Sequence, residues 1–485
     1  MLKIKKDMNR RKIILILVPV LLISTIMLFA FRQKTDPVAK NKVLSELLYS
    51  SLNQAHFNMK EVDDDFSKSA FALYLKAIDN TKRFLLKSDV EQLEQYADKM
   101  DDEFKAGNSK MLNATVEILD QRIPQAKTIV MDLLDKSFDF TLDEKYQLDP
   151  EKRGFPKDEA ELKESWRKLL KYQALIRYQT SIKTEDAKKK KASEDGTDFD
   201  AKSMATMEEE AREQLKKTYN NTFDFLDKMD RDDRAAEYFN AMMSVADPHT
   251  EYFPPEDKEN FDIRMSGKLE GIGAQLQQVD GVIKVSRIVP GSASWKQKEL
   301  KAEDIILKVA QGEEEPVDIS AMPLKDAVKL IRGEKGSEVR LTVKKPDGVI
   351  TVIPIIRDVV ILEENFAKSA IIEEKGKKFG YIKLPSFYAD FAKSGGRNSA
   401  VDVRLELEKL KQQGAEEMIL DLRFNGGGSL GDAIDMSGLF IEDGPVVQVK
   451  TKVAKTKVYA DQDPQVVWKG DLVVLVNRFS ASASE

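Results

Sequence analysis

Apolar residues recur at helical spacing through the first half of the chain. Such spacing places them on one face of a helix. Glycine and clusters of β-branched residues are sparse between Asn41 and Met243, so the pattern predicts an all-helical domain of roughly 200 residues. The residues that show the spacing best are Leu44, Leu47, Leu48 and Leu52, then Leu162, Trp166, Leu169 and Leu170.

One stretch of this region has little apolar content. Residues 183–204 include four consecutive lysines, Lys188 to Lys191, followed by a polar run that contains Gly196. Acidic residues flank the lysines on both sides, which argues against a basic binding patch. We expect a solvated loop or a linker between helices here.

After Pro254 the pattern changes to short β-like runs separated by glycine. A single helical pattern, Leu324 to Ile331, interrupts them. Five short strands with one or two helices predict a small β-rich module. The expected strands are residues 271–276, 282–289, 305–309, 339–343 and 350–355.

From Phe379 onward, strand patterns alternate with helix patterns. This alternation predicts an α/β core with largely parallel strand pairing. The expected strands are residues 381–384, 418–422 and 446–449 with a final apolar run at 472–476, and the expected helices are 403–410 and 430–440.

The N-terminus has the pattern of an export segment. Six basic residues among the first 12 precede an uncharged run of 19 residues, Ile13 to Phe31, which is long enough to cross a bilayer. The positive-inside rule then places everything after Arg32 outside the cytoplasm. Leu28 and Ala30 make a poor cleavage site, which favours an uncleaved anchor over a removed signal peptide.

Composition narrows the chemistry. A formal charge of −6 argues against a dedicated nucleic-acid binder, and the absence of cysteine excludes disulfides, thiolate metal sites and a cysteine nucleophile. The chain has only two histidines, His56 and His249, and no HExxH motif, so neither a zinc site nor a Ser-His-Asp triad is expected. We expect no metal and no cofactor, and any hydrolytic chemistry must use another base.

Two corners between a strand and a helix carry candidate chemistry. The run Leu472 to Val476 leads into small residues and a Ser482–Glu485 pair at capping-box spacing, which predicts the start of a helix. A serine at such a turn lies beside helix N-terminal amides that can stabilise an oxyanion. On spacing alone, these serines are more often helix caps.

The second corner is Asp421 to Leu430, in which Gly426, Gly427 and Gly428 can form an anion-binding turn. A phosphate-binding enzyme using residues 425–428 is a rival, but the GxxxxGK[ST] pattern is missing. Together the two corners predict a paired site, with the Gly427 and Ala483 amides facing one tetrahedral oxyanion.

These corners carry a family resemblance. Residues 421–428 (DLRFNGGG) and 480–485 (SASASE) resemble the signature segments of the C-terminal processing peptidases, in particular the tail-specific proteases of the bacterial envelope. Three further segments, residues 83–90, 247–255 and 380–388, also resemble that branch. The resemblance covers essentially the whole chain after the N-terminal segment.

The resemblance implies a serine/lysine mechanism. Ser482 matches the family's nucleophile, and the lysine base would follow roughly 25 residues later, beyond Glu485. We therefore expect a chain truncated within its protease core and inactive by itself. Under this reading His249 is a structural residue of a linking segment, and His56 is a surface or packing histidine.

The β-rich module resembles a PDZ domain. Gly271, Ile272, Gly273 and Ala274 stand where PDZ amides bind a peptide's C-terminal carboxylate. A substrate tail would add as a strand beside residues 273–276, and the helix at 324–331 would form the other wall of the groove. Ala274 replaces a larger apolar residue, which leaves the depth of the side-chain pocket open.

The sequence thus predicts a multidomain α+β protein. Its parts are a signal peptide or anchor (1–34), a helical domain (35–250), a PDZ domain (251–356) and an incomplete α/β protease core of the crotonase/ClpP kind (357–485). The predicted function is endopeptidase cleavage of proteins with exposed apolar C-termini, on the periplasmic side of the bacterial inner membrane. An envelope adaptor protein is a further expected partner. The alternative is a non-catalytic PDZ-containing envelope adaptor.

Overall fold

The structure is a computed structural model that describes residues 37–485 except positions 280, 321, 392, 394, 453 and 454. The chain divides into two compact units, with the boundary between Tyr252 and Phe253. The predicted export segment, residues 1–34, lies outside the described residues. None of the helices in the described part is long and apolar enough to cross a bilayer.

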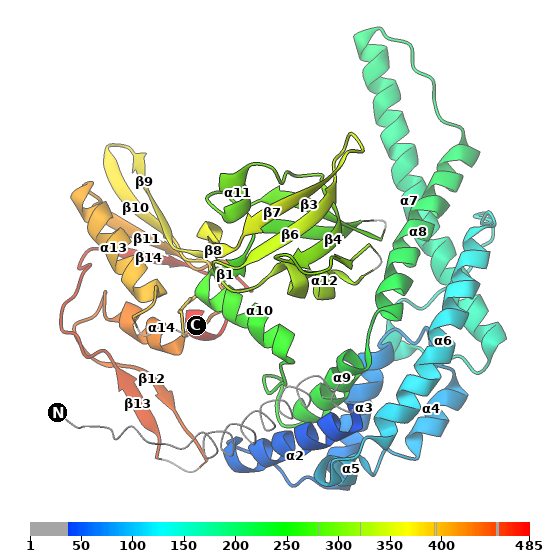
Figure 1. The fold of residues 1–485 in the computed structure, drawn as a ribbon, viewed down its shortest axis with the longest axis horizontal. Helices are drawn as coiled ribbons and strands as arrows, with labels where there is room; N and C mark the ends of the chain where they lie inside the picture. The colour runs from blue at the N-terminus through cyan, green and yellow to red at the C-terminus, as the bar shows by residue number, and fades with distance from the viewer. Residues whose placement is uncertain (1–36, 280, 321, 392, 394, 453–454) are drawn as a thin grey trace, which may run out of the picture. The chain divides into compact units, whose positions relative to one another are not determined.

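The first unit is helical, as the apolar spacing predicts (Figure 1). Its core contains buried aromatic residues such as Tyr74 and Tyr238, whose rings pack edge to face at 5.3 Å. His56 Nε2 lies 2.7 Å from Asp247 Oδ2, so this histidine has a packing role within the unit. The helices are α2 Pro37–Ala55, α3 Asp64–Asp79, α4 Lys87–Glu94, α5 Met100–Ala106, α6 Lys110–Leu134, η1 Pro150–Lys152, α7 Glu159–Asp195, α8 Met204–Asp227 and α9 Arg231–Met243.

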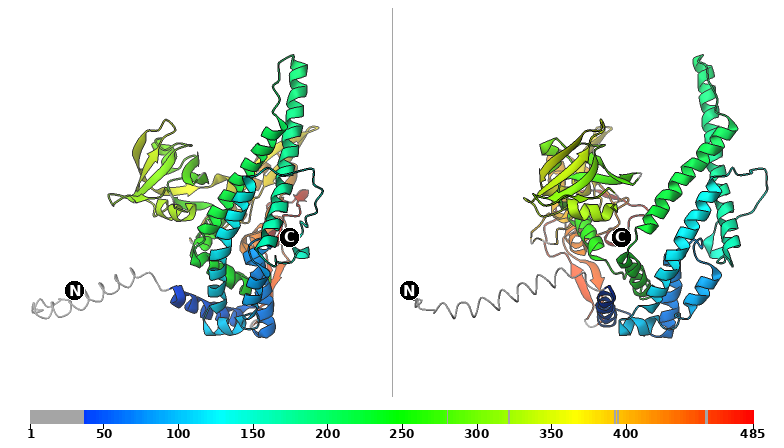
Figure 2. Two further views of the ribbon diagram at one scale, coloured as in Figure 1. Left: turned by 90° about the vertical axis from the view of Figure 1, so that its right-hand side faces the viewer. Right: turned by 45° about the vertical axis from the view of Figure 1, so that its right-hand side comes forward.

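The long hairpin of α7 and α8 corrects one prediction (Figure 2). Helix α7 continues to Asp195, so the loop predicted for residues 183–204 is confined to 196–203. Lysine, alanine and glutamate are strong helix formers, and Lys188 pairs with Glu185 at 2.8 Å. Gly196, at φ 66°, ends the helix. The low apolar content signals an exposed helix, not a loop.

The PDZ-like module opens the second unit. Its antiparallel sheet has the order β2-β3-β4-β6-β7, so β2 is an edge strand, and β5 pairs only with β4. One predicted strand, 271–276, is split: β1 ends at Gly271 and pairs with β8, and Gly273 turns the chain at φ 77°. The elements are α10 Pro255–Ser266, β1 Lys268–Gly271, β2 Ala274–Val279, β3 Val282–Ile288, α11 Ala293–Gln297, β4 Ile305–Gln311, β5 Val317–Asp318, α12 Leu324–Ile331, β6 Glu338–Lys344, β7 Ile350–Ile356 and β8 Asp358–Ile361.

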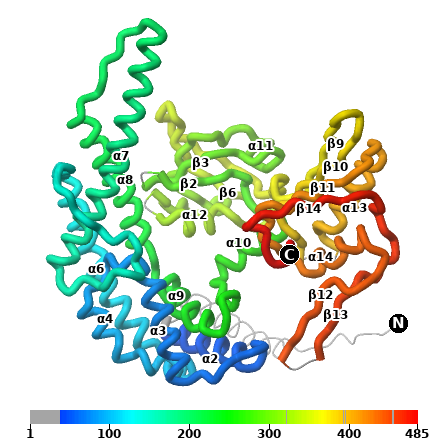
Figure 3. Tube along the Cα trace, turned by 180° about the vertical axis from the view of Figure 1, so that it is seen from behind, coloured from blue at the N-terminus to red at the C-terminus, as the bar shows by residue number. Residues whose placement is uncertain are grey.

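The α/β part follows, with the strand order β14-β11-β10-β9 (Figure 3). The β10–β11 and β11–β14 pairs are parallel as predicted, whereas β9 pairs antiparallel with β10. The strand predicted at 446–449 does not join this sheet, because β12 forms an antiparallel hairpin with β13. The elements are η2 Glu363–Asn365, β9 Lys368–Glu374, β10 Lys377–Lys383, α13 Ser399–Gln412, β11 Glu417–Asp421, α14 Leu430–Ser437, β12 Pro445–Val449, β13 Lys457–Ala460, β14 Leu472–Leu475 and η3 Ser482–Ser484.

The turn after α3 depends on Asp79. This buried carboxylate accepts hydrogen bonds from the backbone N–H groups of Arg83, Phe84 and Leu85 at 2.9–3.0 Å. We expect Asp79→Ala to lower the free energy of unfolding by about 2–3 kcal/mol, because buried donors lose their acceptor. Urea unfolding measures this, with exposed Asp64→Ala as the control, expected within about 0.5 kcal/mol of wild type. Equal losses in both variants would contradict the role of Asp79.

Candidate functional site

The two predicted corners meet at one edge of the α/β sheet. Strands β11 and β14 run parallel, with Asp421 opposite Leu475, so the carboxyl ends of the two strands lie at the same edge of the sheet. The Leu422 N–H donates to Leu475 O at 2.8 Å and extends the pairing by one residue. The loop after β11 and the loop after β14 therefore lie side by side.

Two asparagines fasten these loops together. Asn477 Oδ1 accepts hydrogen bonds from the N–H groups of Phe424, at 3.1 Å, and Phe479, at 3.0 Å. Fully buried Asn425 accepts from the Ala481 N–H at 3.1 Å and from Ser484 Oγ at 2.9 Å, both through its backbone carbonyl. These contacts hold the backbone of the serine corner against the glycine corner.

The glycine turn lies directly against Ser482. Gly427 has φ 99°, and a Cβ placed there would lie 2.8 Å from Ser482 Cβ and 3.1 Å from Ala483 N. Gly428, at φ 139°, faces the backbone of Phe387 just as closely, because Ser429 N–H donates to Phe387 O at 2.7 Å. Only glycine fits both positions without strain.

The serine corner differs from its prediction in one respect. Ser482 begins a single 3₁₀ turn, η3, and no side chain caps it, so the expected capping box with Glu485 does not form. Ser482 has φ 54°, a left-handed backbone conformation that residues other than glycine rarely adopt. Strained backbone of this kind is held in place only where its surroundings fix it, and it is concentrated at functional sites.

The amide positions bear on the oxyanion prediction. Gly427 N–H donates to the side-chain Oδ1 of Asn425 at 2.9 Å. To bind an oxyanion, the Gly427 N–H would have to release Asn425 Oδ1 or form a second hydrogen bond beside it. The Ala483 amide lies at the turn beside Ser482. Among the described residues, no side chain forms a hydrogen bond with Ser482 Oγ.

Asp421, a buried carboxylate for which the sequence predicted no role of its own, stabilises the start of the glycine corner. Asp421 accepts from Tyr381 Oη at 2.6 Å and from Arg423 Nη2 at 2.8 Å. The Arg423 guanidinium holds the pKa of this carboxyl well below its usual range, despite burial, and Asp421 in turn raises the pKa of Tyr381. Because Asp421 is the last residue of β11, this cluster fixes the point where the glycine loop begins.

Of the four amides predicted to bind a carboxylate, Gly271 belongs to β1 and pairs with Asp358 of β8, and the contacts of the turn bear on those of Gly273 and Ala274. The Ile272 carbonyl accepts from Ser294 N–H at 2.9 Å, and the Gly273 carbonyl accepts from Val289 N–H at 2.8 Å. In a trans peptide the next N–H points opposite to the carbonyl, so the amides of Gly273 and Ala274 face away from that turn. They lie where β2, the edge strand, begins.

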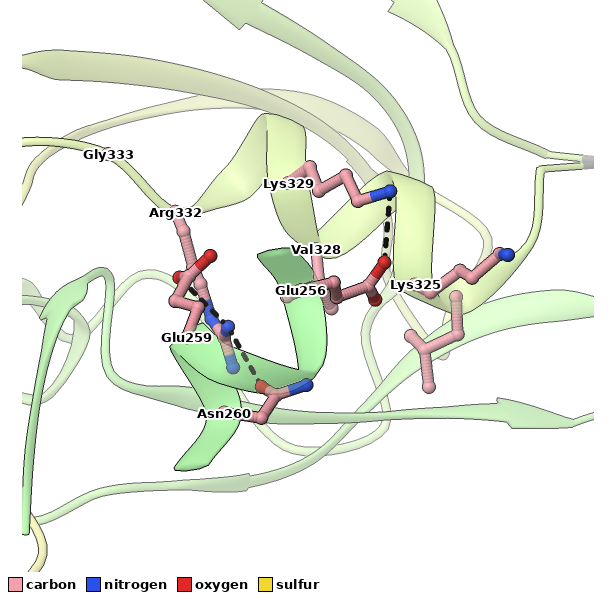
Figure 4. Close-up of a pocket in the computed structure, with 9 residues that line it drawn as sticks. Glu256, Glu259, Asn260, Lys325, Val328, Lys329, Arg332 and Gly333 are labelled. Carbon is pink, nitrogen blue, oxygen red and sulfur yellow. Dashed lines mark hydrogen bonds and ion pairs between the residues drawn. The ribbon is translucent and has the colours of Figure 1, made fainter. Parts of the chain in front are cut away.

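A pocket of about 490 Å³ lies beside the helix of this module, between α10 and α12 (Figure 4). Leu324, Val328 and Arg332 of α12 line one side, and Glu259 and Asn260 of α10 line the other. Ala327 and Ile331, on the opposite side of α12, are buried in the module's core.

Family models match three segments of the chain. Residues 48–256 match the tail specific protease N-terminal domain, residues 261–344 the PDZ domain and residues 378–485 peptidase family S41. A tail-specific protease of Haemophilus influenzae is 34% identical over 436 residues, or 90% of this chain. The C-terminal segment of the chain thus matches peptidase family S41, and the segments before it match domains that the tail-specific proteases carry.

Two further similarities cover parts of the chain. A carboxyl-terminal-processing protease of Picosynechococcus is 32% identical over 52% of this chain. A solved PDZ domain of a carboxy-terminal protease from Vibrio cholerae is 39% identical and aligns with 19% of this chain and 97% of its own, at a TM-score of 0.19. The chain spans 58% of the length of both the Haemophilus and the Picosynechococcus relatives.

The contact between the two corners suggests a test of packing. We expect Gly427→Ala to lower the free energy of unfolding by about 2–4 kcal/mol, because φ 99° disfavours alanine and the new Cβ would collide with Ser482. Gly426→Ala is a matched control, since nothing lies within 4 Å of a Cβ there. Thermal and urea unfolding measure both. Equal tolerance of the two alanines would show that the corners are not in contact.

Asp421 gives a pH dependence with a definite sign. Its folded pKa is depressed, so its contribution to stability is complete above about pH 4, the ordinary aspartate pKa, and is lost as the pH falls toward the folded value. We expect wild type to lose about 1–2 kcal/mol more than Asp421→Asn between about pH 4 and pH 2, allowing for the half-exposed Arg423. Urea unfolding across this range measures it. Parallel pH profiles would contradict the assignment.

Proposed function

We propose that this chain is the larger part of an envelope endopeptidase that hydrolyses peptide bonds with Ser482 as nucleophile. The observation that carries the proposal is the packing of left-handed Ser482 against Gly427 at one sheet edge. The base is a lysine beyond residue 485, in line with relatives that are longer than this chain. The core has the crotonase/ClpP kind of fold.

The proposed chemistry has two steps. Ser482 Oγ attacks the scissile carbonyl carbon and passes its proton to the neutral lysine, and the carbonyl oxygen becomes an oxyanion near the Ala483 amide, with Gly427 as second donor. The lysine returns the proton to the leaving amine as the C–N bond breaks. Water then attacks the acyl-enzyme ester, and its proton returns through the lysine to Ser482.

Lysine suits this role because a desolvated ammonium has a lowered pKa and can be neutral near pH 7. Asn425 positions the site in this scheme, since its side chain holds Gly427 N–H and its carbonyl holds Ala481 and Ser484. Movement of Gly427 N–H from Asn425 Oδ1 to the oxyanion would favour the transition state over the resting enzyme.

The PDZ module would select substrates by their C-terminal tails. An extended apolar tail adds to the free edge of β2, beside the amides of Gly273 and Ala274, with α12 as the other wall. The proposed location is the periplasmic side of the bacterial inner membrane, reached through residues 1–34. An adaptor that docks on the helical unit is a further proposed partner.

One observation favours the alternative of a non-catalytic adaptor. Within the described residues, Ser482 lacks a general base, so these 485 residues alone are expected to bind tails without cleaving them. A peptide-cleavage assay that compares this chain with the longer gene product separates the two functions. Cleavage by the longer protein supports the enzyme, and its absence supports the adaptor.

The nucleophile assignment predicts a specific loss. In the protein that includes the proposed lysine, Ser482→Ala should lower kcat for an unstructured substrate with an apolar tail by at least about a thousandfold. Ser437→Ala, the matched control, removes one hydroxyl that donates to Ala433 within α14, away from the two corners, and should keep most of the activity. Gel-based cleavage and circular dichroism measure activity and folding. Wild-type cleavage by Ser482→Ala would disprove the assignment.

A further inference from the structure

Two ion pairs join α10 to the groove helix α12. Arg332 Nη1 lies 3.1 Å from Glu259 Oε1 and 3.2 Å from Asn260 Oδ1, and Lys329 Nζ lies 3.0 Å from Glu256 Oε2. Figure 4 shows both contacts reaching from α12 to α10. They are only partly shielded, since the Arg332 side chain is 26% exposed and that of Glu259 is 54% exposed.

The two cations differ in their surroundings. Arg332 follows the last residue of α12 and lies beside the start of the amide turn: a Cβ on Gly271 would be 3.8 Å from Arg332 Cα and 3.9 Å from its Cγ. Lys329 lies almost one helical turn earlier along α12. Arg332 is therefore a cation at the carboxylate end of the proposed groove, where Lys296 and Lys335 are already paired with Asp358.

A second arginine fixes this end of the helix. Arg357 is 3% exposed, and its guanidinium donates to the carbonyls of Ile331, at 2.9 Å, and Leu330, at 3.1 Å. These bonds satisfy carbonyls at the C-terminus of α12, so the Arg332 side chain is not needed as a cap. No carboxylate pairs with Arg357 in the described part of the chain, and its remaining N–H groups donate to Ser337 Oγ at 2.9 Å and Gln311 Oε1 at 2.6 Å.

We propose that Arg332 receives the C-terminal carboxylate of a bound peptide, and that Glu259 and Asn260 hold its guanidinium while the groove is empty. The ligand is a peptide with a free carboxyl terminus and apolar last residues. The planar guanidinium matches a carboxylate and has five N–H donors, so it adds charge recognition to the Gly273 and Ala274 amides. This inference rests on the proposed recognition of tails by the PDZ module.

The proposal predicts that Glu259 and the peptide carboxylate compete for Arg332, and this competition can be measured. Glu259 and the peptide carboxylate are rivals for one guanidinium, so removing Glu259 should strengthen binding while removing Arg332 should weaken it. The Lys329–Glu256 pair joins the same two helices but lies away from Gly271. Glu256→Gln is therefore a matched control that loosens α10 equally without freeing Arg332.

The experiment compares one apolar-tailed peptide as the free acid and as the C-terminal amide, by fluorescence anisotropy with the whole chain. Wild type should bind the acid about tenfold more tightly than the amide, and Arg332→Gln should bind the two alike. Glu259→Gln should bind the acid about two- to threefold more tightly than wild type, and Glu256→Gln should match wild type within about 1.5-fold. Arg332→Lys, which keeps the charge, should retain part of the preference.

The outcomes separate the two levels of the proposal. If wild type binds neither peptide, tail recognition by the PDZ module fails and the inference fails with it. If wild type prefers the acid but Arg332→Gln keeps that preference with an unchanged melting temperature, tail recognition stands and the role of Arg332 is wrong. Equal gains from Glu259→Gln and Glu256→Gln would also overturn it, because they would show a general effect of loosening α10.

Discussion

The parallel register of β11 and β14 is the constraint on which the candidate active site depends. With Asp421 opposite Leu475, the two strands end together and their loops leave the sheet side by side. A shift of one residue would turn every side chain of one strand to the other face and would separate Asn477 from the amides it binds. The Asp421–Arg423–Tyr381 cluster at the strand end joins β11 to β10, its neighbour on the other side.

The two proposed binding sites share one local backbone arrangement. In each, a glycine with positive φ lies so close to a serine that a side chain would collide: a Cβ on Gly273 would be 2.0 Å from Ser292 Cβ, and a Cβ on Gly427 would be 2.8 Å from Ser482 Cβ. In each proposed site, backbone amides would bind a negative charge. One anion would be a peptide's terminal carboxylate and the other a tetrahedral intermediate, so both proposed steps of tail processing rely on backbone amides.

Much of the fold could be predicted from local patterns in the sequence. Helix α12 has the predicted bounds, and the alternating pattern after Phe379 correctly indicated parallel pairs around β11. The predictions were wrong where the structure depends on contacts between residues distant in the sequence, or where a helix is exposed and carries mainly polar side chains. Strand β12 pairs with β13, a strand that the sequence pattern did not predict. The lysine-rich part of α7 is helical although almost none of its side chains are buried. The role of Asp421 depends on Tyr381 of β10, and that of Asn477 on Phe424 of the glycine loop, although an asparagine just after a strand is a known turn signal.

The central claim is that the two sheet-edge corners form one site with Ser482 as nucleophile. A crystal structure of the protein that includes the proposed lysine, bound to a peptidyl boronic acid, tests it most directly. The account predicts a covalent bond from boron to Ser482 Oγ, with a boronate oxygen within hydrogen-bond distance of the Ala483 amide. A boronate bound to another residue, or a Ser482 corner separated from Gly427, would contradict it.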